Sequence, residues 1–440
     1  MRCQVLVVGA GPAGAELARQ LATHSIDVLL VERLPDLRRA AFSSAALPLK
    51  ALDAFGLPSC VVAQRWSGWE LLGPAGGRRH WRGDGPQGVV LDFAALRQWL
   101  VAEAERWGAR VWLGHQAVIC REKEDGLCTT LRRSDGRCVD VHSDWVIDAT
   151  GQERGLLGEP PCGELVSGVG LEWLVEVPQA CWQRWSDRLA FCLGSDWVAQ
   201  GYGWVFPMQS PRLKLGVCRL IDHEHRQEPL AAVFARLISR VLDPPERESM
   251  VVIDRHGGLI RSTIRRREPH WRGRLVGLGD AVSTANLLGG EGIRHALTSA
   301  RVLAPLLLQD LRRDDRLKAA QRRHVAGERQ AWPRLSDWVA TLWRGAGITV
   351  PPMTPPRTTS LSLQRYPQEL RRALGWRWSL SGRLARRTWL GLNGASADRR
   401  LDALLSSLEN QPADVLSELL FDYRFERYGW RALPYLLGLR

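Results

Sequence analysis

Residues 5–18 read VLVVGAGPAGAELA, and this glycine-rich segment restricts the fold more than any other part of the chain. An apolar β-branched run leads into the glycines and a helical apolar period follows them, which predicts a strand, a tight turn and a helix. Gly9 permits the turn, Gly11 lets the backbone approach a pyrophosphate, and Gly14 allows the helix to pack close to the strand. The helix N-terminus then faces phosphate. We therefore predict a dinucleotide site that contains Gly9, Gly11, Pro12, Ala13 and Gly14.

The next apolar run, IDVLLVER, ends in an acid at the spacing expected for a ribose ligand. Glu32 lies 18 residues after Gly14, and a carboxylate near this spacing accepts hydrogen bonds from ribose hydroxyls. Strand, glycines, helix, second strand and acid thus occur in the order of a Rossmann-like unit. Glu32 is the predicted ribose ligand, and the neighbouring Arg33 is included among the cofactor contacts.

A second glycine-rich segment, GRLVGLGDAVSTANLLGGEGI at residues 273–293, selects the cofactor. Residues 274–278 are typical of a strand that places Asp280 at its carboxyl end, and the glycines that follow open an apolar helix. Asp280 can accept a hydrogen bond from a ribitol hydroxyl, and the helix N-terminus can direct N–H groups at the pyrimidine edge of a flavin. An acid at Glu32 serves NAD and FAD equally, so this segment decides for FAD. Its predicted contacts are Gly279, Asp280, Gly290, Glu291, Gly292 and Ile293.

Together the two segments resemble the glutathione-reductase-like FAD superfamily, and within it the geranylgeranyl reductase family with its aromatic-hydroxylase and halogenase relatives. DWVIDATGQ (144–152) is similar to the turn that returns the chain toward the cofactor, with Thr150 and Gly151 at matching positions. LDFAALRQWLVAEAERWGARV (91–111) resembles the helix and strand that precede this turn. The resemblance implies that Arg97 contacts the FAD phosphates, and it covers about the first three-quarters of the chain.

A further segment, QGYGWVFPMQSPRLKLGV (200–217), resembles the Tyr-x-Trp-x-Phe-Pro stretch that lies beside the flavin in the reductases. Tyr202, Trp204 and Phe206 share one strand face because side chains alternate along a strand. Periodicity alone leaves a core stripe and a pocket wall open. The resemblance implies the pocket, and Tyr202 and Trp204 are the predicted catalytic-pocket residues, with a structural phenol as the alternative for Tyr202.

The chain also departs from its relatives. Aromatic hydroxylases usually carry paired prolines where this chain reads Asn286-Leu287, which argues against a monooxygenase. The reductases commonly carry a cysteine in the loop after the ribose-binding acid. This chain offers Arg39, Ser43 and Ser44 there, and they are predicted cofactor contacts. The Trp-x-Trp-x-Ile-Pro stretch of flavin halogenases is not found.

The resemblance implies an α/β fold. It consists of a Rossmann-like FAD-binding domain with a parallel sheet, an inserted antiparallel β-sheet substrate domain and a small, mainly helical C-terminal lobe. The alternating runs and turn residues of 165–222 independently indicate the antiparallel sheet. The predicted boundaries are 1–160 and 261–325 for the two parts of the FAD-binding domain, 161–260 for the substrate domain, and 326–440 for a basic lobe with a Pro/Thr/Ser linker at 348–364.

The function implied is reduction of carbon–carbon double bonds in a prenyl or other long apolar substrate, by hydride transfer from reduced flavin. The expected electron donor is NAD(P)H or reduced ferredoxin. The chain has no second glycine fingerprint, so a nicotinamide donor would bind without a Rossmann domain of its own. The alternatives are a flavin-dependent monooxygenase and a non-redox, FAD-dependent carotenoid cyclase. The cyclase would need a buried acid near the ring, for which Glu291 is the candidate. A helix N-terminal acid favoured by the dipole is the other interpretation of Glu291.

The C-terminal region is strongly basic within a chain of net charge +13. Residues 357–400 contain ten arginines and no lysine against two acids, a net charge of +8. Trp376, Trp378 and Trp389 lie among these arginines, a combination suited to a membrane surface. An acidic electron-carrier protein would fit the same charge, and so would a solvated basic face. No nucleic-acid recognition motif accompanies it.

Other features set the expected cellular context. No apolar run reaches the roughly 18 residues of a membrane span, and the N-terminus leads directly into a strand without signal-peptide features. Nine scattered cysteines favour reduced thiols, with neither a disulfide framework nor a metal site. The chain is therefore expected in the cytoplasm, free or peripheral at a membrane surface.

Overall fold

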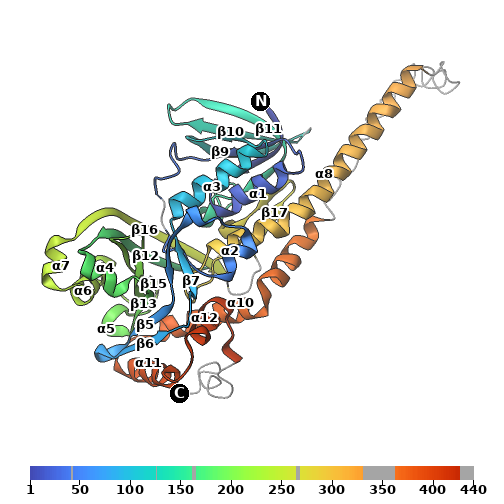
Figure 1. Ribbon diagram of the computed structural model, residues 1–440. Helices are drawn as coiled ribbons and strands as arrows, with labels where there is room; N and C mark the ends of the chain where they lie inside the picture. The colour runs from blue at the N-terminus through green and yellow to red at the C-terminus, as the bar shows by residue number, and fades with distance from the viewer. Residues whose placement is uncertain (41–42, 125, 161–164, 264–267, 331–361, 427–440) are drawn as a thin grey trace.

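The computed structural model describes residues 1–40, 43–124, 126–160, 165–263, 268–330 and 362–426. Its first layer is a mainly parallel sheet built from two distant parts of the chain (Figure 1). All neighbouring strands from β18 to β8 pair in parallel, and β18, which comes late in the chain, completes the sheet as predicted. The order is β17 (Trp271–Arg272), β18 (Leu275–Gly277), β11 (Cys138–Asp148), β1 (Arg2–Val8), β2 (Val28–Val31) and β8 (Arg110–Trp112), with the hairpin β9 (His115–Lys123) and β10 (Gly126–Arg133) attached to β11.

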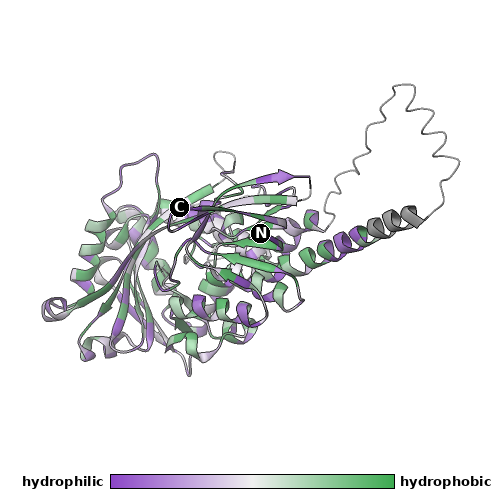
Figure 2. Ribbon diagram, turned by 90° about the horizontal axis from the view of Figure 1, so that it is seen from above, coloured by the Kyte–Doolittle hydropathy of each residue, from purple (hydrophilic) through white to green (hydrophobic). Residues whose placement is uncertain are grey.

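Long helices provide many of the apolar side chains for the core on this sheet, among them α1 (Pro12–Ala22), α3 (Phe93–Arg106) and α8 (Ile293–Gln330). Pro12 occupies the first turn of α1, where its missing N–H costs nothing. Asp92 caps α3 by accepting a hydrogen bond from the Ala95 N–H at 3.0 Å. The far part of α8 projects from the body (Figure 1), and in Figure 2 hydrophilic residues cover much of its coloured length.

The second layer is a largely antiparallel sheet, as predicted for the inserted segment. β5 and β6 also belong to it, although they come from the range predicted for the FAD-binding domain, and β5 pairs in parallel with β13. The substrate layer thus combines chain segments from before and after β11. Its order is β16 (Val251–Thr263), β12 (Leu165–Glu176), β15 (Arg212–Leu220), β14 (Gly201–Pro207), β13 (Arg188–Leu193), β5 (Gly68–Leu72) and β6 (Arg78–Arg82).

The two faces of this second sheet bury different side chains. Aliphatic residues such as Val205 and Val217 pack against α6 (Leu230–Val241) on one face. The alternate positions on β14, Tyr202, Trp204 and Phe206, belong to a separate aromatic cluster on the other face. The period-two prediction of a shared face is therefore correct. Helices α4 (Gln179–Trp185), α5 (Ser195–Val198) and α7 (Pro244–Ser249) complete this layer.

The described C-terminal residues form helices, as predicted, and complete both cores. Leu370 packs into the core of the first sheet, whereas Trp389 and Phe421 pack into the aromatic cluster. Of the predicted linker 348–364, residues 348–361 lie outside the described residues. The helices are α10 (Tyr366–Gly391), α11 (Ala395–Leu408) and α12 (Ala413–Asp422).

Smaller elements connect these layers. A three-stranded sheet has the order β3 (Ala46–Pro48), β7 (Gly88–Leu91) and β4 (Val62–Trp66), beside the short helix α2 (Lys50–Phe55). In the parts of the chain that the structure describes, we find no helix with the length and apolar character needed to cross a bilayer. The 3₁₀ helices are Ser59–Val61, Pro74–Gly76, Gly151–Glu153, Gly279–Val282 and Leu363–Arg365.

Candidate active site

A cavity of about 260 Å³ joins the glycine-rich loops of the first layer to the aromatic face of the second. We call Phe191, Tyr202, Trp204, Phe206 and Trp389 the aromatic wall, since all five line this cavity. From the predicted cofactor contacts, the lining includes Pro12, Ser43, Ser44, Asp280, Gly290, Gly292 and Ile293.

The first glycine turn has the conformation that its residues require. Gly9 has φ +106°, and a Cβ there would lie 2.3 Å from the Ala149 carbonyl oxygen. A Cβ on Gly14 would lie 2.0 Å from the Gly9 oxygen, so the close packing of α1 on β1 depends on this glycine. In contrast, a Cβ on Gly11 would have no protein neighbour within 4 Å. The start of α1 also has no side-chain cap, so its first N–H groups remain available for an anion.

Glu32 is buried at the end of β2 and is held by the backbone. Its Oε2 accepts a hydrogen bond from the Ala10 N–H at 2.9 Å, and its Oε1 accepts one from the Leu34 N–H at 3.1 Å. The Arg97 guanidinium lies 3.7 Å from Oε2. Arg97 also donates to the carbonyls of Leu37 and Arg39, while its buried Nε has no hydrogen-bond partner among the described residues. The carboxylate and this cation therefore lie together beside the glycine turn.

Asp280 lies on the 3₁₀ turn between β18 and α8. Its burial raises the pKa of the carboxyl group, and the Thr284 hydroxyl donates a hydrogen bond to it at 2.9 Å. Gly279, with φ +62°, brings this turn so close to α1 that a Cβ would lie 2.7 Å from the Ala13 Cβ. The starts of α1 and α8 are thereby brought to the same side of the sheet, next to the cavity.

The indole of Trp204 lies across a glycine to reach a buried carboxylate. Trp204 on β14 is opposite Gly216 on β15, which is opposite Glu172 on β12. A Cβ on Gly216 would lie 2.1 Å from the Trp204 ring, so this glycine leaves the path for the indole. Its Nε1–H donates to Glu172 Oε2 at 3.0 Å. Burial raises the pKa of Glu172, although the charge of Lys214 and this hydrogen bond oppose the shift.

Lys214 connects the same sheet to the loop that precedes β3. Its buried Nζ donates to the Ser43 carbonyl oxygen at 2.5 Å. Burial lowers the pKa of Lys214, and the charge of Glu172 partly compensates. Sequence reasoning missed both charged residues, because polar residues that alternate with apolar ones in a strand normally face solvent. They have no local signal in the sequence, because only the register of β12, β15 and β14 places them on the face of the aromatic stripe.

Comparison with known proteins shows the family to which this chain belongs. A model described as FAD binding domain matches residues 2–48, and one described as Tryptophan halogenase matches residues 88–345. The digeranylgeranylglycerophospholipid reductase of Haloferax volcanii is 28% identical over 318 residues, covering 68% of this chain and 74% of the relative. The menaquinone reductase of Mycolicibacterium smegmatis is 27% identical over 321 residues, covering 70% and 76%. The chain belongs to the family of FAD-dependent oxidoreductases that contains geranylgeranyl reductases and tryptophan halogenases.

The fold of this FAD-dependent oxidoreductase matches that of a solved structure over nearly the whole of both chains. A geranylgeranyl bacteriochlorophyll reductase-like protein of Thermoplasma acidophilum superposes with a TM-score of 0.73 at 20% sequence identity. The match covers 97% of this chain and 98% of that one. The predicted fold class is confirmed, and the shared architecture includes the C-terminal helices.

The residues of the oxidoreductase fit FAD. The open space at Gly11 leaves room for a pyrophosphate at the start of α1. Arg97 offers a buried, unpartnered Nε near Glu32, and Asp280 offers a carboxyl group beside the start of α8 and the aromatic wall. These are the donor and acceptor types that phosphate, ribose and ribitol require. The individual cofactor contacts remain predictions.

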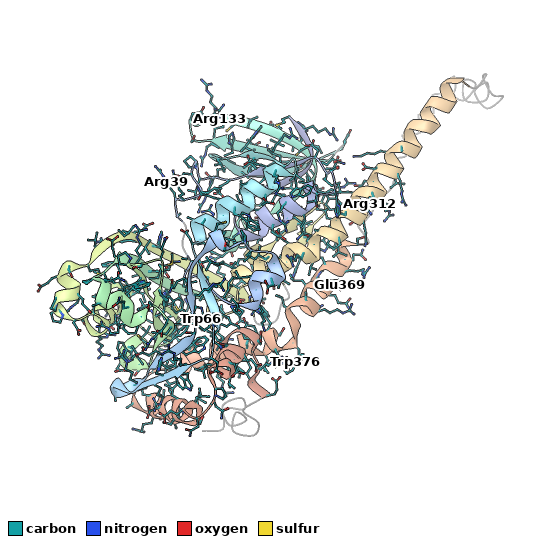
Figure 3. All side chains as sticks on the ribbon, in the orientation of Figure 1. Arg39, Trp66, Arg133, Arg312, Glu369 and Trp376 are labelled. Atoms are coloured by element: carbon teal, nitrogen blue, oxygen red, sulfur yellow. The ribbon has the colours of Figure 1, made fainter. Side chains whose placement is uncertain are left out.

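Among the remaining predicted cofactor residues, two arginines are exposed and two residues form a turn. Arg33 is exposed and lies 3.5 Å from Glu153, and Arg39 is exposed at the edge of the molecule (Figure 3). Thr150 donates from its N–H and its hydroxyl to Asp148 Oδ1, at 3.1 and 2.6 Å, which closes the turn before Gly151. Arg33, Arg39, Thr150 and Gly151 do not line the cavity as it is formed by the described residues.

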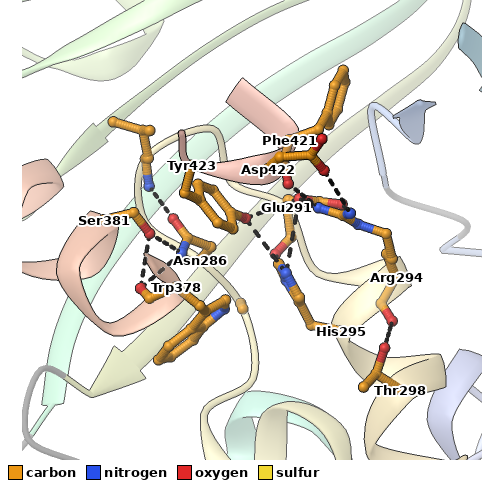
Figure 4. Close-up of polar contacts among 12 residues, drawn as sticks. Asn286, Glu291, Arg294, His295, Thr298, Trp378, Ser381, Phe421, Asp422 and Tyr423 are labelled. Atoms are coloured by element: carbon orange, nitrogen blue, oxygen red, sulfur yellow. Dashed lines mark hydrogen bonds and ion pairs between the residues drawn. The ribbon is translucent and has the colours of Figure 1, made fainter. Parts of the chain in front are cut away.

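Glu291 belongs to a buried polar network at the start of α8 (Figure 4). Its carboxylate accepts from Arg294 at 2.5 and 2.9 Å and from the Tyr423 hydroxyl at 2.9 Å, and His295 Nε2 lies 3.9 Å away. Burial opposes ionisation, but the charges of Arg294 and His295 hold the pKa of Glu291 below its ordinary value. A carboxylate paired in this way is a poor proton donor, which argues against the acid role that the cyclase alternative needs.

Of the three tryptophans that lie among the arginines of the C-terminal region, two are covered by the protein itself. Trp378 and Trp389 are buried, and only Trp376, with 64% exposure, faces outward. Trp389 donates to the carbonyls of Leu287 and Leu288 at 3.2 Å and is a site residue that sequence reasoning missed. The spacing of Trp378, Ala385 and Trp389 along one helix face was the available signal.

Proposed function

We propose that this flavoenzyme reduces carbon–carbon double bonds in the prenyl chain of a lipid-like substrate. The observation that carries the proposal is the cavity, which connects the predicted flavin contacts Asp280 and Gly290 to the aromatic wall. A long apolar chain can bury its surface against five aromatic side chains, with a gain of roughly 25 cal/mol per Å². The names of two relatives, digeranylgeranylglycerophospholipid reductase and menaquinone reductase, support a lipid-like substrate class.

The residues of the chain would bind and orient the substrate and exclude water. When bound, FAD supplies the two-electron redox chemistry. Glu172 fixes the indole of Trp204 through the 3.0 Å hydrogen bond, so this part of the wall keeps one orientation. Burial raises the pKa of Tyr202 well above its ordinary value, and its phenol therefore keeps its proton at working pH. We assign Tyr202 to substrate packing. The proton that completes the reduction of the double bond would then come from water or from another group beside the substrate.

The test is an anaerobic half-reaction. The FAD-loaded protein is reduced with dithionite, mixed with a geranylgeranyl-bearing lipid in detergent, and followed by flavin absorbance and by mass spectrometry of the lipid. We expect flavin reoxidation and a product that has gained two hydrogen atoms. No reoxidation without oxygen, followed by oxygen incorporation in air, would overturn the proposal in favour of a monooxygenase. A rearranged product of unchanged mass would indicate the cyclase.

The same preparation identifies the electron donor. NADH, NADPH and reduced ferredoxin are each mixed with the oxidised protein, and the rate of flavin reduction is compared.

A pair of matched variants tests the role of the aromatic wall in turnover. Trp389→Phe alters the aromatic wall, and Trp107→Phe alters an indole that is 50% exposed away from the cavity. Reductase turnover should fall in the first variant and stay unchanged in the second.

A further inference from the structure

The helix α10 has two faces of opposite character beyond its bend at Gly375. Positions spaced by three, four and seven residues lie on the same side of a helix. Trp378, Ala385 and Trp389 are buried on the inner side. The outer side consists of exposed Trp376, Arg383, Arg386 and Arg387 with the half-buried Leu380. We call these five residues the basic face of α10.

The arginines of the basic face are not neutralised. Among the described residues, Arg383, Arg386 and Arg387 have no carboxylate within 4.0 Å. In contrast, Arg372 of the same helix and Arg365 just before it pair with Glu369, at 3.1 and 3.3 Å, and Arg377 pairs with Glu426. The charge on the basic face is therefore available to a partner outside the chain.

We propose that the basic face of α10 docks on the surface of an anionic lipid membrane. The 64% exposed indole of Trp376 suits the headgroup level, where indoles concentrate. Arginines around Leu380 on one helix side suit an interfacial helix, because the guanidinium groups reach anionic headgroups while Leu380 and the aliphatic stems of the arginines face the acyl boundary. An acidic electron-carrier protein would match the charge alone, whereas the exposed indole favours lipid. Figure 3 shows Trp376 on α10 at the margin of the molecule.

The inner side of the same helix reaches the cavity. Trp389 lines the cavity and is fixed by its hydrogen bonds to the Leu287 and Leu288 carbonyls. A membrane-bound α10 would thus hold the cavity close to the bilayer in which a prenyl lipid resides. This biological rationale rests on the proposed function, but the surface and its test do not.

The test is co-sedimentation of the full FAD-loaded chain with vesicles. Phosphatidylcholine vesicles are compared with vesicles that also contain phosphatidylserine, at low and high salt. We expect salt-sensitive binding to the anionic vesicles only. Each basic residue near an anionic surface contributes about fivefold to partitioning, so R383E/R386E/R387E should lose about a hundredfold or more. Trp376→Ser, which keeps the charge, should weaken binding by a smaller factor.

The matched control moves the same charge change to another exposed site. Arg312→Glu with Arg313→Glu changes two exposed arginines on α8, and it is compared with Arg383→Glu/Arg387→Glu. Flavin absorbance should be unchanged in every variant, which shows that a loss of vesicle binding is not a loss of the folded, FAD-loaded protein. Equal losses in the α8 and α10 variants, equal binding to neutral vesicles, or binding to reduced ferredoxin with none to anionic vesicles would each overturn the proposal.

Discussion

The hydrogen bond between Trp204 and Glu172 should make a measurable contribution to stability. Trp204 Nε1 donates to a carboxylate that is only 1% exposed, at 3.0 Å. Hydrogen bonds to charged groups contribute about 1.5–3 kcal/mol, and removal of one partner leaves the other without compensation in the interior. Trp204→Phe and Glu172→Met should therefore each lower the free energy of unfolding. In the double variant both polar partners are gone, so its loss should be smaller than the sum of the two single losses.

The assay is urea unfolding of the FAD-loaded protein and its three variants, followed by far-UV circular dichroism. We expect a coupling free energy of about 1.5–3 kcal/mol between the two positions. Unrelated sites are additive to within about 0.5 kcal/mol. If the two single losses in the free energy of unfolding add up within this limit, the reasoning is refuted, because the indole and the carboxylate then do not depend on each other.

The pH dependence gives a second check on Glu172. Its pKa in the folded protein is raised above the ordinary value, chiefly by burial. The folded state therefore gains relative stability below the ordinary carboxyl pKa of about 4.3, and this gain is lost as the pH rises through the raised pKa. Glu172→Gln cannot titrate and should remove this part of the slope. An identical pH profile of the urea midpoint in the two proteins would contradict the assignment.

Three further results are expected. Arg97→Met should raise the FAD dissociation constant about tenfold to a hundredfold, as measured by fluorescence titration, because a charged donor beside Glu32 is lost; an unchanged constant would exclude Arg97 from the site. Tyr202→Phe should reduce kcat by less than tenfold, against the roughly 10²–10⁴ of a general acid, since burial raises its pKa. Burial lowers the pKa of Lys214, so stability should fall as the pH decreases from the ordinary lysine value of about 10.4; Lys214→Met should flatten this slope in urea titrations, and a retained slope would assign it to another group.

The parallel sheet and the two glycine turns could be predicted because their signals are local. Gly9, Gly14 and Glu32 act within one strand–turn–helix–strand unit, so their spacing reflects the contacts they make. The strand and helix around Asp280 followed from the same logic, since that segment has its own strand and helix signals. In each case, a residue's sequence neighbours are also its neighbours in space.

The interior of the cavity could not be predicted in this way. Glu172 and Trp204 come from strands separated by β15, and only the register of three strands brings them together. The composition of α10 suggested an exposed basic segment, but composition does not show which helix side is covered. Trp389 is buried because it packs against Tyr202 of β14 and donates to the carbonyls of Leu287 and Leu288, and the spacing along its helix face does not show these distant partners.

The position of Trp389 has a consequence for the order of synthesis. The turns that contain Gly9 and Asp280 are complete once residues 1–330 have been made, whereas one side of the cavity comes from α10, near the end of the chain. Folding during translation starts at the N-terminus. A nascent chain that has not yet reached α10 would thus form its glycine turns while the cavity still lacks Trp389 as part of its wall.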